Sequence, residues 1–385
     1  MAFILFDNPA RSSLYPLTYT KAVAAIRLGI FTIKERWQRL IGEEIYVQTA
    51  DYLQCLYPAV PEGIHTWIDG CILPSDELVE KIKMMRQGDV YKDEKGVIAC
   101  KGLGRIISDA LENTAMNFAT IEVQRLCYLQ QIVQWNEAFI NFDFKLITKD
   151  RTSAVLSSTN RSLHQENIFI ENGASIEFAI INASHGPVYI GAGATVMEGC
   201  LLKGPLVIGD NAVIKMGAKI YGATTISPNC IAGGEIKNSV MQANSNKAHD
   251  GYLGDSMIGE WCNLGAGVSN SNVKNTADTI KLWNFNEKAF VDAGNKCGVI
   301  TGDYTRVAIN SSINTGSVYG VSCNVFGEGL LPTRLRAFSW GAGGEGYAVD
   351  KAIKHIRQWK YFKNQILSNE EESVLKYIFD NFLDE

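Results

Sequence analysis

The sequence predicts an α/β N-terminal domain, a parallel β-helix and a C-terminal pair of helices. Strand and helix patterns alternate before the middle of the chain, a six-residue apolar period occupies the middle, and two helical patterns follow. A period of six fits neither the 3.6 residues of a helix turn nor the alternation of an open sheet, so it indicates stacked coils. The residues that define this period are Ile190, Val196, Leu202, Ile208, Ile214, Ile220 and Ile226.

Residues 1–105 are expected to form the α/β domain, with short strands at 2–6, 44–48 and 65–68 and one or two helices between 20 and 40. Such alternation is typical of a sheet covered by helices. Residues 106–160 are predicted to be a helical bridge. Its aromatic and leucine stripe is typical of a buried face.

The repeat extends in both directions from its central run, so we expect the β-helix to span residues 161–340 in about nine coils. Its pattern is similar to the left-handed hexapeptide-repeat helix, in which three hexapeptides form one triangular coil. The repeat is interrupted near 236–256 and 270–290. Insertions in a solenoid gather on one face, which is often the binding face.

Residues 341–385 carry the two helical patterns that follow the repeat. Ser368 and Glu371 have the spacing of a capping box that opens the second helix. We expect the pair to close the end of the solenoid or to pack on a neighbouring subunit. Phosphate binding by the basic first helix is the alternative.

Composition predicts a cytoplasmic protein that binds neither nucleic acid nor membrane. The net charge is −5, and the sequence contains no apolar run long enough to span a bilayer. The nine cysteines form no Cys-x-x-Cys pair and no tight cluster with histidine. We therefore expect reduced, buried thiols and no metal site.

The interrupted part of the repeat carries the polar residues that favour chemistry. His249 lies there, and an imidazole titrates near neutral pH. A carboxylate, a cation, a hydroxyl and two amides occur within a few coils: Glu235, Lys237, Tyr252, Asn263 and Asn272. This mixture suits a phosphorylated sugar.

Three ordered motifs carry a family resemblance. They are Gly234-Glu-Ile-Lys-Asn-Ser, Lys247-Ala-His-Asp-Gly-Tyr-Leu-Gly-Asp and Ile258-Gly-Glu-Trp-Cys-Asn-Leu-Gly-Ala-Gly. Together they resemble the acetyltransferase half of the bifunctional N-acetylglucosamine-1-phosphate uridyltransferase/glucosamine-1-phosphate acetyltransferases. That family joins a nucleotidyltransferase domain to a trimeric left-handed β-helix. The resemblance therefore implies a homotrimeric transferase of nucleotide-sugar biosynthesis.

The same resemblance implies acetyl transfer from acetyl-CoA to an amino-sugar phosphate such as glucosamine-1-phosphate. It assigns the general base to His249, with Glu235 assisting. Asp278 stands near the place where the family has a lysine, which leaves the sugar and the acyl group open. The remaining implied contacts are Lys215, Lys237 and Tyr252 with the sugar phosphate, Asn263 and Asn272 with the sugar, and Ala266 with acetyl-CoA.

The N-terminal domain resembles a reduced nucleotidyltransferase domain. Leu14-Tyr-Pro-Leu-Thr is similar to the end of that family's phosphate loop, but Pro9 and Arg11 replace its glycines and Ser13 its arginine. Proline removes a backbone donor, so we expect little nucleotidyl transfer. Asp69 is the candidate metal ligand, and Mg²⁺ is expected only if this domain is active.

Two alternatives remain open for the function. The first is a sugar-1-phosphate nucleotidyltransferase that makes UDP- or dTDP-sugars, with Arg11 and Lys21 in place of the lost phosphate contacts. The second is a non-catalytic trimer that binds a sugar nucleotide.

Overall fold

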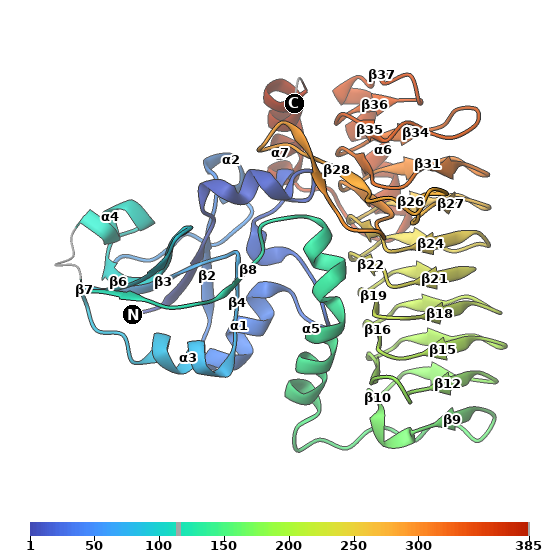
Figure 1. Cartoon of the computed structure of the whole chain (residues 1–385), viewed down its shortest axis with the longest axis horizontal. Coiled ribbons are helices and arrows are strands. Elements are labelled where there is room, and N and C mark those ends of the chain that lie inside the picture. The colour runs from blue at the N-terminus through green and yellow to red at the C-terminus, as the bar shows by residue number, and fades with distance from the viewer. Residues whose placement is uncertain (113–116, 384–385) are drawn as a thin grey trace.

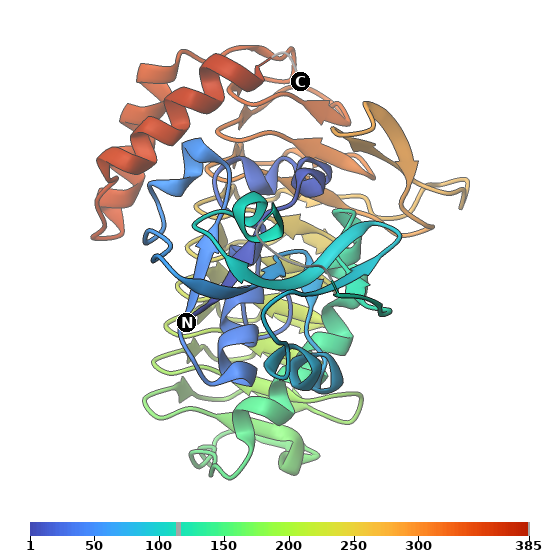
Figure 2. The same cartoon turned by 90° about the vertical axis from the view of Figure 1, so that its left-hand side faces the viewer.

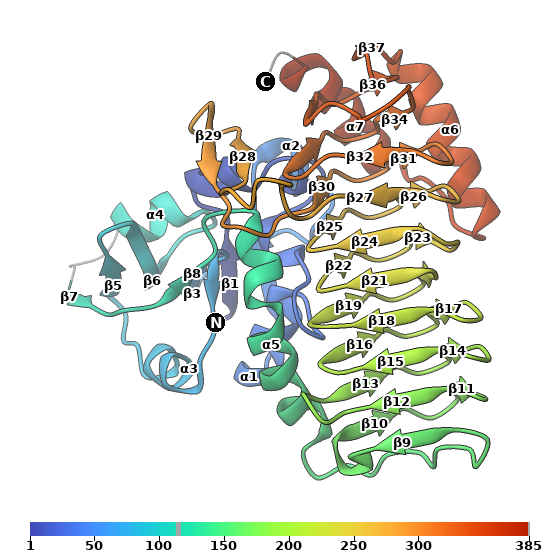
Figure 3. The ribbon, with the colours of Figure 1, turned by 45° about the vertical axis from the view of Figure 1, so that its right-hand side comes forward.

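The N-terminal domain lies alongside a long solenoid (Figure 1). The computed structural model describes residues 1–112 and 117–383. The solenoid runs the length of the molecule, and α5 (Gln130–Thr148) stands between it and the N-terminal sheet (Figure 3). The predicted fold class, an α/β domain followed by a left-handed β-helix and C-terminal helices, is confirmed.

The N-terminal domain is built on a six-stranded sheet in the order β2-β1-β3-β6-β5-β7. Its strands are β1 (Phe3–Phe6), β2 (Ile45–Gln48), β3 (Ile64–Asp69), β5 (Asp89–Asp93), β6 (Gly96–Leu103) and β7 (Asn117–Thr120). β1 pairs in parallel with both β2 and β3, as alternation with helices predicts. β7 pairs with β5, so the sheet continues beyond residue 105.

The helical part of the bridge begins later than the sequence pattern suggests. β8 (Gln124–Arg125) pairs with β4 (Ile72–Leu73) inside the segment predicted to be helical. The helices of this half are α1 (Ile33–Ile41), α2 (Asp51–Gln54), α3 (Asp76–Lys83), α4 (Ile107–Glu112) and α5, with 3₁₀ turns η1 (Pro9–Leu14), η2 (Leu17–Tyr19) and η3 (Val23–Ala25). The segment 20–40, predicted to contain one or two helices, therefore consists of turns followed by the single helix α1.

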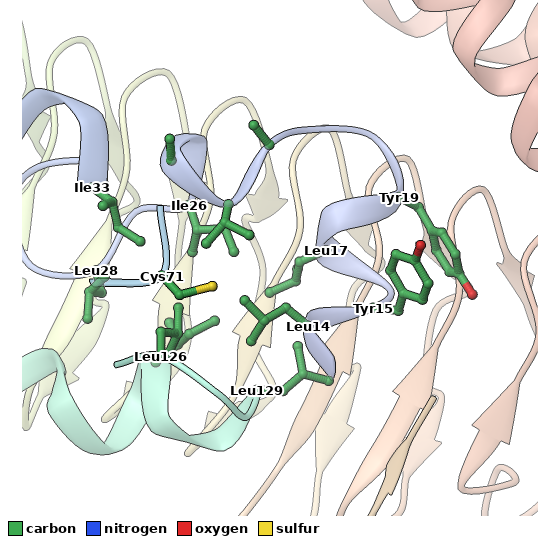
Figure 4. Packing of buried hydrophobic residues seen from close by; sticks show 14 of the residues in the cluster. Leu14, Tyr15, Leu17, Tyr19, Ile26, Leu28, Ile33, Cys71, Leu126 and Leu129 are labelled. Atoms are coloured by element: carbon green, nitrogen blue, oxygen red, sulfur yellow. The ribbon is translucent and has the colours of Figure 1, made fainter. Parts of the chain in front are cut away.

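The core of this domain forms under the chain from Leu14 to Ile33. Side chains of that segment contact Cys71, which precedes β4, Leu126, which follows β8, and Leu129 at the start of α5 (Figure 4). These residues are almost fully buried. Residues distant in sequence thus share one apolar cluster, which ties the bridge to the sheet.

The solenoid has three faces. The nine-stranded face contains β10 (Ile168–Ile170), β13 (Val188–Ile190), β16 (Leu206–Ile208), β19 (Thr224–Ile226), β22 (Val240–Met241), β25 (Met257–Ile258), β30 (Val299–Thr301), β33 (Ser317–Tyr319) and β35 (Arg334–Leu335). The ten-stranded face contains β11 (Ser175–Ile176), β14 (Thr195–Val196), β17 (Val213–Ile214), β20 (Ile231–Ala232), β23 (Asn246–Lys247), β26 (Asn263–Leu264), β31 (Arg306–Val307), β34 (Asn324–Val325), β36 (Ser339–Trp340) and β37 (Glu345–Gly346).

The six-stranded face contains β9 (Arg161–Leu163), β12 (Ile180–Asn182), β15 (Leu201–Lys203), β18 (Lys219–Tyr221), β21 (Glu235–Lys237) and β24 (Tyr252–Gly254). A separate pair, β27 (Ser269–Asn270) and β32 (Ser312–Ile313), follows, and η4 (Gln165–Asn167) lies in the first coil. All seven residues of the predicted six-residue ladder are buried in the solenoid interior.

One predicted interruption is regular solenoid and the other is an insertion. Residues 236–256 form β21 to β24 and pair with the coils on both sides, so the prediction of a polar insertion there is wrong. The apolar period is lost because the coils shorten: fifteen residues separate Ile226 from its partner Met241, whereas eighteen separate Ile208 from Ile226. Residues 270–290 do leave the solenoid, and they carry the hairpin of β28 (Lys281–Asn284) and β29 (Ala289–Asp292).

The C-terminal helices lie beside the solenoid. α6 (Val349–Phe362) runs along the ten-stranded face, and α7 (Asn369–Phe382) lies near α2, where Tyr377 stacks on Tyr52 at 4.4 Å (Figures 2 and 3). The capping box of Ser368 and Glu371 is confirmed. The last coil is followed by the antiparallel pair β36–β37. Among the described residues, no helix has the length and apolarity needed to cross a membrane.

Two kinds of contact join the N-terminal domain to the solenoid. Ile30 and Phe31 belong to an apolar cluster with Tyr189 and Val207 on the nine-stranded face. Lys21 forms ion pairs with Asp303 at 3.0 Å and with Glu260 at 2.7 Å, and both carboxylates belong to the solenoid. The two halves are packed as one unit.

A buried ion pair fixes α5 against the start of α1. Asp143 accepts from Arg36 Nε and Nη2, both at 2.7 Å, and both side chains are fully buried. The same carboxylate accepts from the backbone amides of Ile30 at 2.8 Å and Phe31 at 3.2 Å. One side chain therefore holds the segment that contacts the nine-stranded face.

We expect Asp143→Ala to lower the free energy of unfolding by about 3–5 kcal/mol, because it leaves a buried guanidinium without its carboxylate partner. Urea unfolding followed by circular dichroism measures this loss. Lys81→Ala, which breaks an exposed pair with Glu77, is the control and should leave the midpoint nearly unchanged. Equal midpoints for the two variants would contradict the role of Asp143.

Candidate functional site

His249 lies in the turn between β23 and β24, where the chain passes from the ten-stranded to the six-stranded face. Its side chain is exposed and forms no hydrogen bond or ion pair with the described residues. The turn stacks on the next coil, since Gly267 N donates to Asp250 O at 2.9 Å. The imidazole therefore sits on a fixed backbone with both ring nitrogens available.

Four of the predicted site residues come together on the six-stranded face. Glu235 is opposite Tyr252 in the register, and Lys237 is opposite Gly254. The Tyr252 ring covers Gly254, where an added Cβ would lie 2.3 Å from the hydroxyl oxygen. Asn272, which follows β27, donates to the Tyr252 hydroxyl at 3.3 Å. Consecutive coils thus present a carboxylate, a cation, a phenol and an amide.

Tyr221 joins this cluster from the coil before, and the sequence analysis missed it. Its hydroxyl donates to Glu235 Oε1 at 2.6 Å, and its ring lies 5.8 Å from Lys237 Nζ. The hydrogen bond to the carboxylate, aided by burial, raises the pKa of Tyr221 to about 12. Tyr221 could be identified only by its position opposite Lys237, and that position follows from the coil register.

Asp255 is a second residue that the sequence analysis missed. This buried carboxylate accepts from Asn238 Nδ2 at 2.5 Å and from Asn272 Nδ2. Burial is the largest cause that raises the pKa of Tyr252, and the charges of Asp255 and Glu235 add to it. Asp255 therefore orients the amide of Asn272 and adds to the rise in the pKa of the Tyr252 phenol.

Three other predicted residues lie away from this cluster. Lys215 is at the turn two coils before His249, beneath Gly233, whose added Cβ would lie 3.1 Å from Lys215 Cβ. Ala266 lies in the turn after His249's coil, and its carbonyl accepts from Asn310 N at 2.7 Å. Asn263 is on the ten-stranded face, where it accepts from Asn246 Nδ2 at 3.3 Å. Within a single chain, Asn263 therefore does not lie beside Tyr252 and Asn272.

Lys247 is an interior residue of the solenoid. It pairs with Ala232, an interior position of the coil before, and its side chain is fully buried. Nζ donates to Gly233 O at 3.4 Å and to His249 O. Burial lowers the pKa of Lys247 to about 8, although Asp250 opposes the shift. A buried amine thus holds the backbone of the turn that carries His249.

The carboxyl ends of β1 and β3 hold a closed polar cluster. Asp69 forms a buried ion pair with Arg125 and accepts from Asn8 Nδ2 at 2.5 Å. Arg125 also pairs with Asp93 at 3.0 Å. Ligands bind outside the carboxyl ends of strands in open α/β sheets. Here protein groups neutralise the carboxylate at that position.

Arg11 and Lys21 are also occupied by protein groups. Arg11 Nε donates to Asp7 Oδ2 at 3.1 Å, and its Nη2 donates to Thr18 O. Burial disfavours the charge on Lys21, but its two carboxylate partners outweigh that cost and hold its pKa above the usual value. Both side chains are only 7% exposed. Neither cation is presented to an open phosphate site.

The donor set of this domain does not fit Mg²⁺. Mg²⁺ is usually held by one or two carboxylates and by substrate phosphates. Asp69 would have to give up the Arg125 pair first. Across residues 1–112 and 117–383, no three His, Cys, Asp or Glu side chains are grouped as metal ligands. Seven of the nine cysteines are buried, including Cys230 and Cys262 in the solenoid.

Residues 3–152 match the family model of sugar nucleotidyl transferases. The predicted family resemblance is confirmed. The bifunctional protein GlmU of Methanocaldococcus jannaschii is 35% identical over 89 residues, which are 23% of this chain and 21% of that protein. A bifunctional sugar-1-phosphate nucleotidylyltransferase/acetyltransferase of Sulfurisphaera tokodaii is 32% identical over 92 residues, 24% of this chain and 23% of its own. The chain thus spans about a fifth of the length of these relatives.

The solved structures that match this chain are more distant in sequence. The UDP-N-acetylglucosamine acyltransferase of Francisella novicida has 12% sequence identity and a TM-score of 0.28, covering 60% of this chain and 90% of its own. An acetyltransferase of Bacillus cereus has 13% identity and a TM-score of 0.23, covering 54% and 99%.

We expect the buried Lys247 to make stability depend on pH. Between about pH 8 and 10.5 the unfolded chain keeps a proton that the folded chain has lost, so the free energy of unfolding rises with pH there. Urea unfolding at pH 7.5, 8.5 and 9.5 measures this effect. The free energy of unfolding of wild type should rise relative to that of Lys247→Met by up to about 1.4 kcal/mol per pH unit.

Leu264→Met is the matched control for this series, since Leu264 is another interior residue of the ten-stranded face. Its stability difference from wild type should stay constant over the same pH range. A constant difference for Lys247→Met as well would show that the amine does not titrate in this range.

Proposed function

We propose that this protein is an acetyltransferase that moves an acetyl group from acetyl-CoA to the amine of an amino-sugar phosphate such as glucosamine-1-phosphate. The observation that carries the proposal is the exposed His249 in the turn that leads into β24, on the same coil as Tyr252 of the polar cluster that includes Glu235, Lys237 and Asn272. The name of one relative, a bifunctional sugar-1-phosphate nucleotidylyltransferase/acetyltransferase, supports it, whereas the family match of residues 3–152 supports nucleotidyl transfer.

In the proposed reaction, the sugar amine attacks the thioester carbonyl as the free base, and His249 removes a proton from the attacking nitrogen. General-base catalysis requires a neutral imidazole. The tetrahedral intermediate then collapses, the amide forms, and the CoA thiolate leaves and takes up the proton. The oxyanion needs a backbone donor near this turn. Gly265 N is already used, because it donates to Val307 O at 2.9 Å, so we propose Ala266 N as that donor.

The proposed sugar site uses the charges of the six-stranded face. Lys237, with Lys215 nearer the turn, would hold the phosphate as point charges. Glu235 would contact the amine, and the Tyr221 hydroxyl fixes the carboxylate for that contact. Tyr252 and Asn272 would hydrogen-bond the sugar hydroxyls. We include a homotrimer in the proposal, because an exposed cluster on one face needs a second wall to exclude water.

His249→Ala should lower acetyl transfer by about 10²–10⁴-fold, the usual contribution of a general base. Lys237→Ala should instead mainly raise KM for the sugar phosphate, because its charge contact exists in both ground and transition states. The measurement is CoA release with acetyl-CoA and glucosamine-1-phosphate, together with the solution mass by light scattering.

His185→Ala is the control, since His185 is an exposed histidine between β12 and β13, away from the cluster. An active wild type with unchanged turnover in His249→Ala would place the base elsewhere. A wild type that binds neither acetyl-CoA nor sugar phosphates by calorimetry would favour the non-catalytic alternative.

We expect the N-terminal domain to transfer nucleotides poorly. The Asp69–Arg125 pair occupies the strand ends, and Arg11 is committed to Asp7. The assay is pyrophosphate release from UTP or dTTP with N-acetylglucosamine-1-phosphate or glucose-1-phosphate and Mg²⁺. Rapid release by the wild type, strongly reduced in Asp69→Asn, would instead support the sugar-1-phosphate nucleotidyltransferase alternative.

A further inference from the structure

A cavity of about 430 Å³ lies between α6 and the upper coils of the ten-stranded face. Arg306 of β31 and Asn324 of β34 form one wall, and His355 and Trp359 of α6 form the other. All the described residues that line it are polar or aromatic, and none of them is acidic. It does not include any residue of the proposed acetyl-transfer site.

Arg306 is the unusual group of this wall. Its Nε and Nη2 are buried and have no hydrogen-bond partner among the described residues, and only Nη1 donates, to Tyr304 O at 3.3 Å. A buried guanidinium normally has a carboxylate partner, because a buried charge without one is costly. Burial lowers the pKa of Arg306, and only neutral tyrosine and cysteine groups oppose the shift.

The surroundings add positive charge and supply a flat surface. Burial lowers the pKa of His355, and the charges of Arg306, Lys351 and Lys354 lower it further. The Tyr347 hydroxyl and His355 Nδ1 share a hydrogen bond, and Nε2 has no partner among the described residues. The Trp359 ring lies 5.5 Å from the Arg306 guanidinium carbon and packs edge-on against Phe362.

We propose that this cavity binds an oxyanion, a phosphate or a carboxylate group of a small ligand, on Arg306. Nε and Nη2 lie on the same side of a guanidinium, and together they form the fork that donates to two oxygens of one carboxylate or phosphate. A bound anion would supply the missing partner for this charge. His355 Nε2 and the Asn324 amide would complete the polar contacts, and Trp359 would cover a flat part of the ligand.

The test is a thermal-shift and calorimetric titration of the whole chain with sodium phosphate and, separately, sodium acetate, each against sodium chloride at equal ionic strength. A ligand that binds only the folded state raises the melting temperature in a saturable way. We expect one of the two anions to do so, and the one that binds identifies the class. Arg306→Met should weaken that binding at least tenfold and should not lower the melting temperature in chloride, because it removes an unpaired buried charge.

Matched variants separate this cavity from other anion sites. Arg357→Met removes the same charge from α6 but breaks an exposed pair with Glu372, so anion binding should persist. Lys237→Ala should also leave it intact, which distinguishes the cavity from the proposed sugar-phosphate site. If Arg306→Met does not fold, Arg306→Lys serves instead, since it keeps the charge without the fork. No saturable binding in wild type, binding unchanged in the Arg306 variant, or binding lost in Lys237→Ala would overturn the proposal.

Discussion

The parallel register between coils is the constraint on which the rest of this structure depends. Each strand pairs with the strand one coil before, so inward and outward positions alternate along a strand and repeat from one coil to the next. Outward residues of successive coils then form columns, as Tyr221, Lys237 and Gly254 do on the six-stranded face. The candidate site draws on this column and on the neighbouring one of Glu235 and Tyr252, so its geometry follows from backbone pairing more than from side-chain packing.

Much of the solenoid could be predicted from the sequence because its signal is periodic. Wherever coils contain eighteen residues, the apolar positions return at steps of six, and the seven residues from Ile190 to Ile226 mark them without ambiguity. The coils between 226 and 258 contain fewer residues, so the same rule fails there. The interior position is even taken by Lys247, which no hydrophobic pattern can identify.

The candidate site was predictable in part for a related reason. Glu235, Lys237, Tyr252 and Asn272 were found because their motifs are local in sequence. Asn263 was grouped with them by the same proximity, yet a turn of the coil puts it on a different face. Tyr221 and Asp255 contribute through contacts that only the register and the fold create. The partners of Arg11 and Lys21 were equally hidden, because Asp303 is more than 280 residues away from Lys21 in sequence.

The apolar strip on the nine-stranded face has a consequence for how this protein can be divided. Tyr189 and Val207 belong to the solenoid, yet they are buried against Ile30 and Phe31 of the other half. Cutting the chain after α5 would leave these rings and methyl groups in water, together with the carboxylates of Asp303 and Glu260 that Lys21 now neutralises. The two halves are therefore not interchangeable modules on a linker. A solenoid from another protein could be grafted here only if it carried the same strip and the same pair of acids.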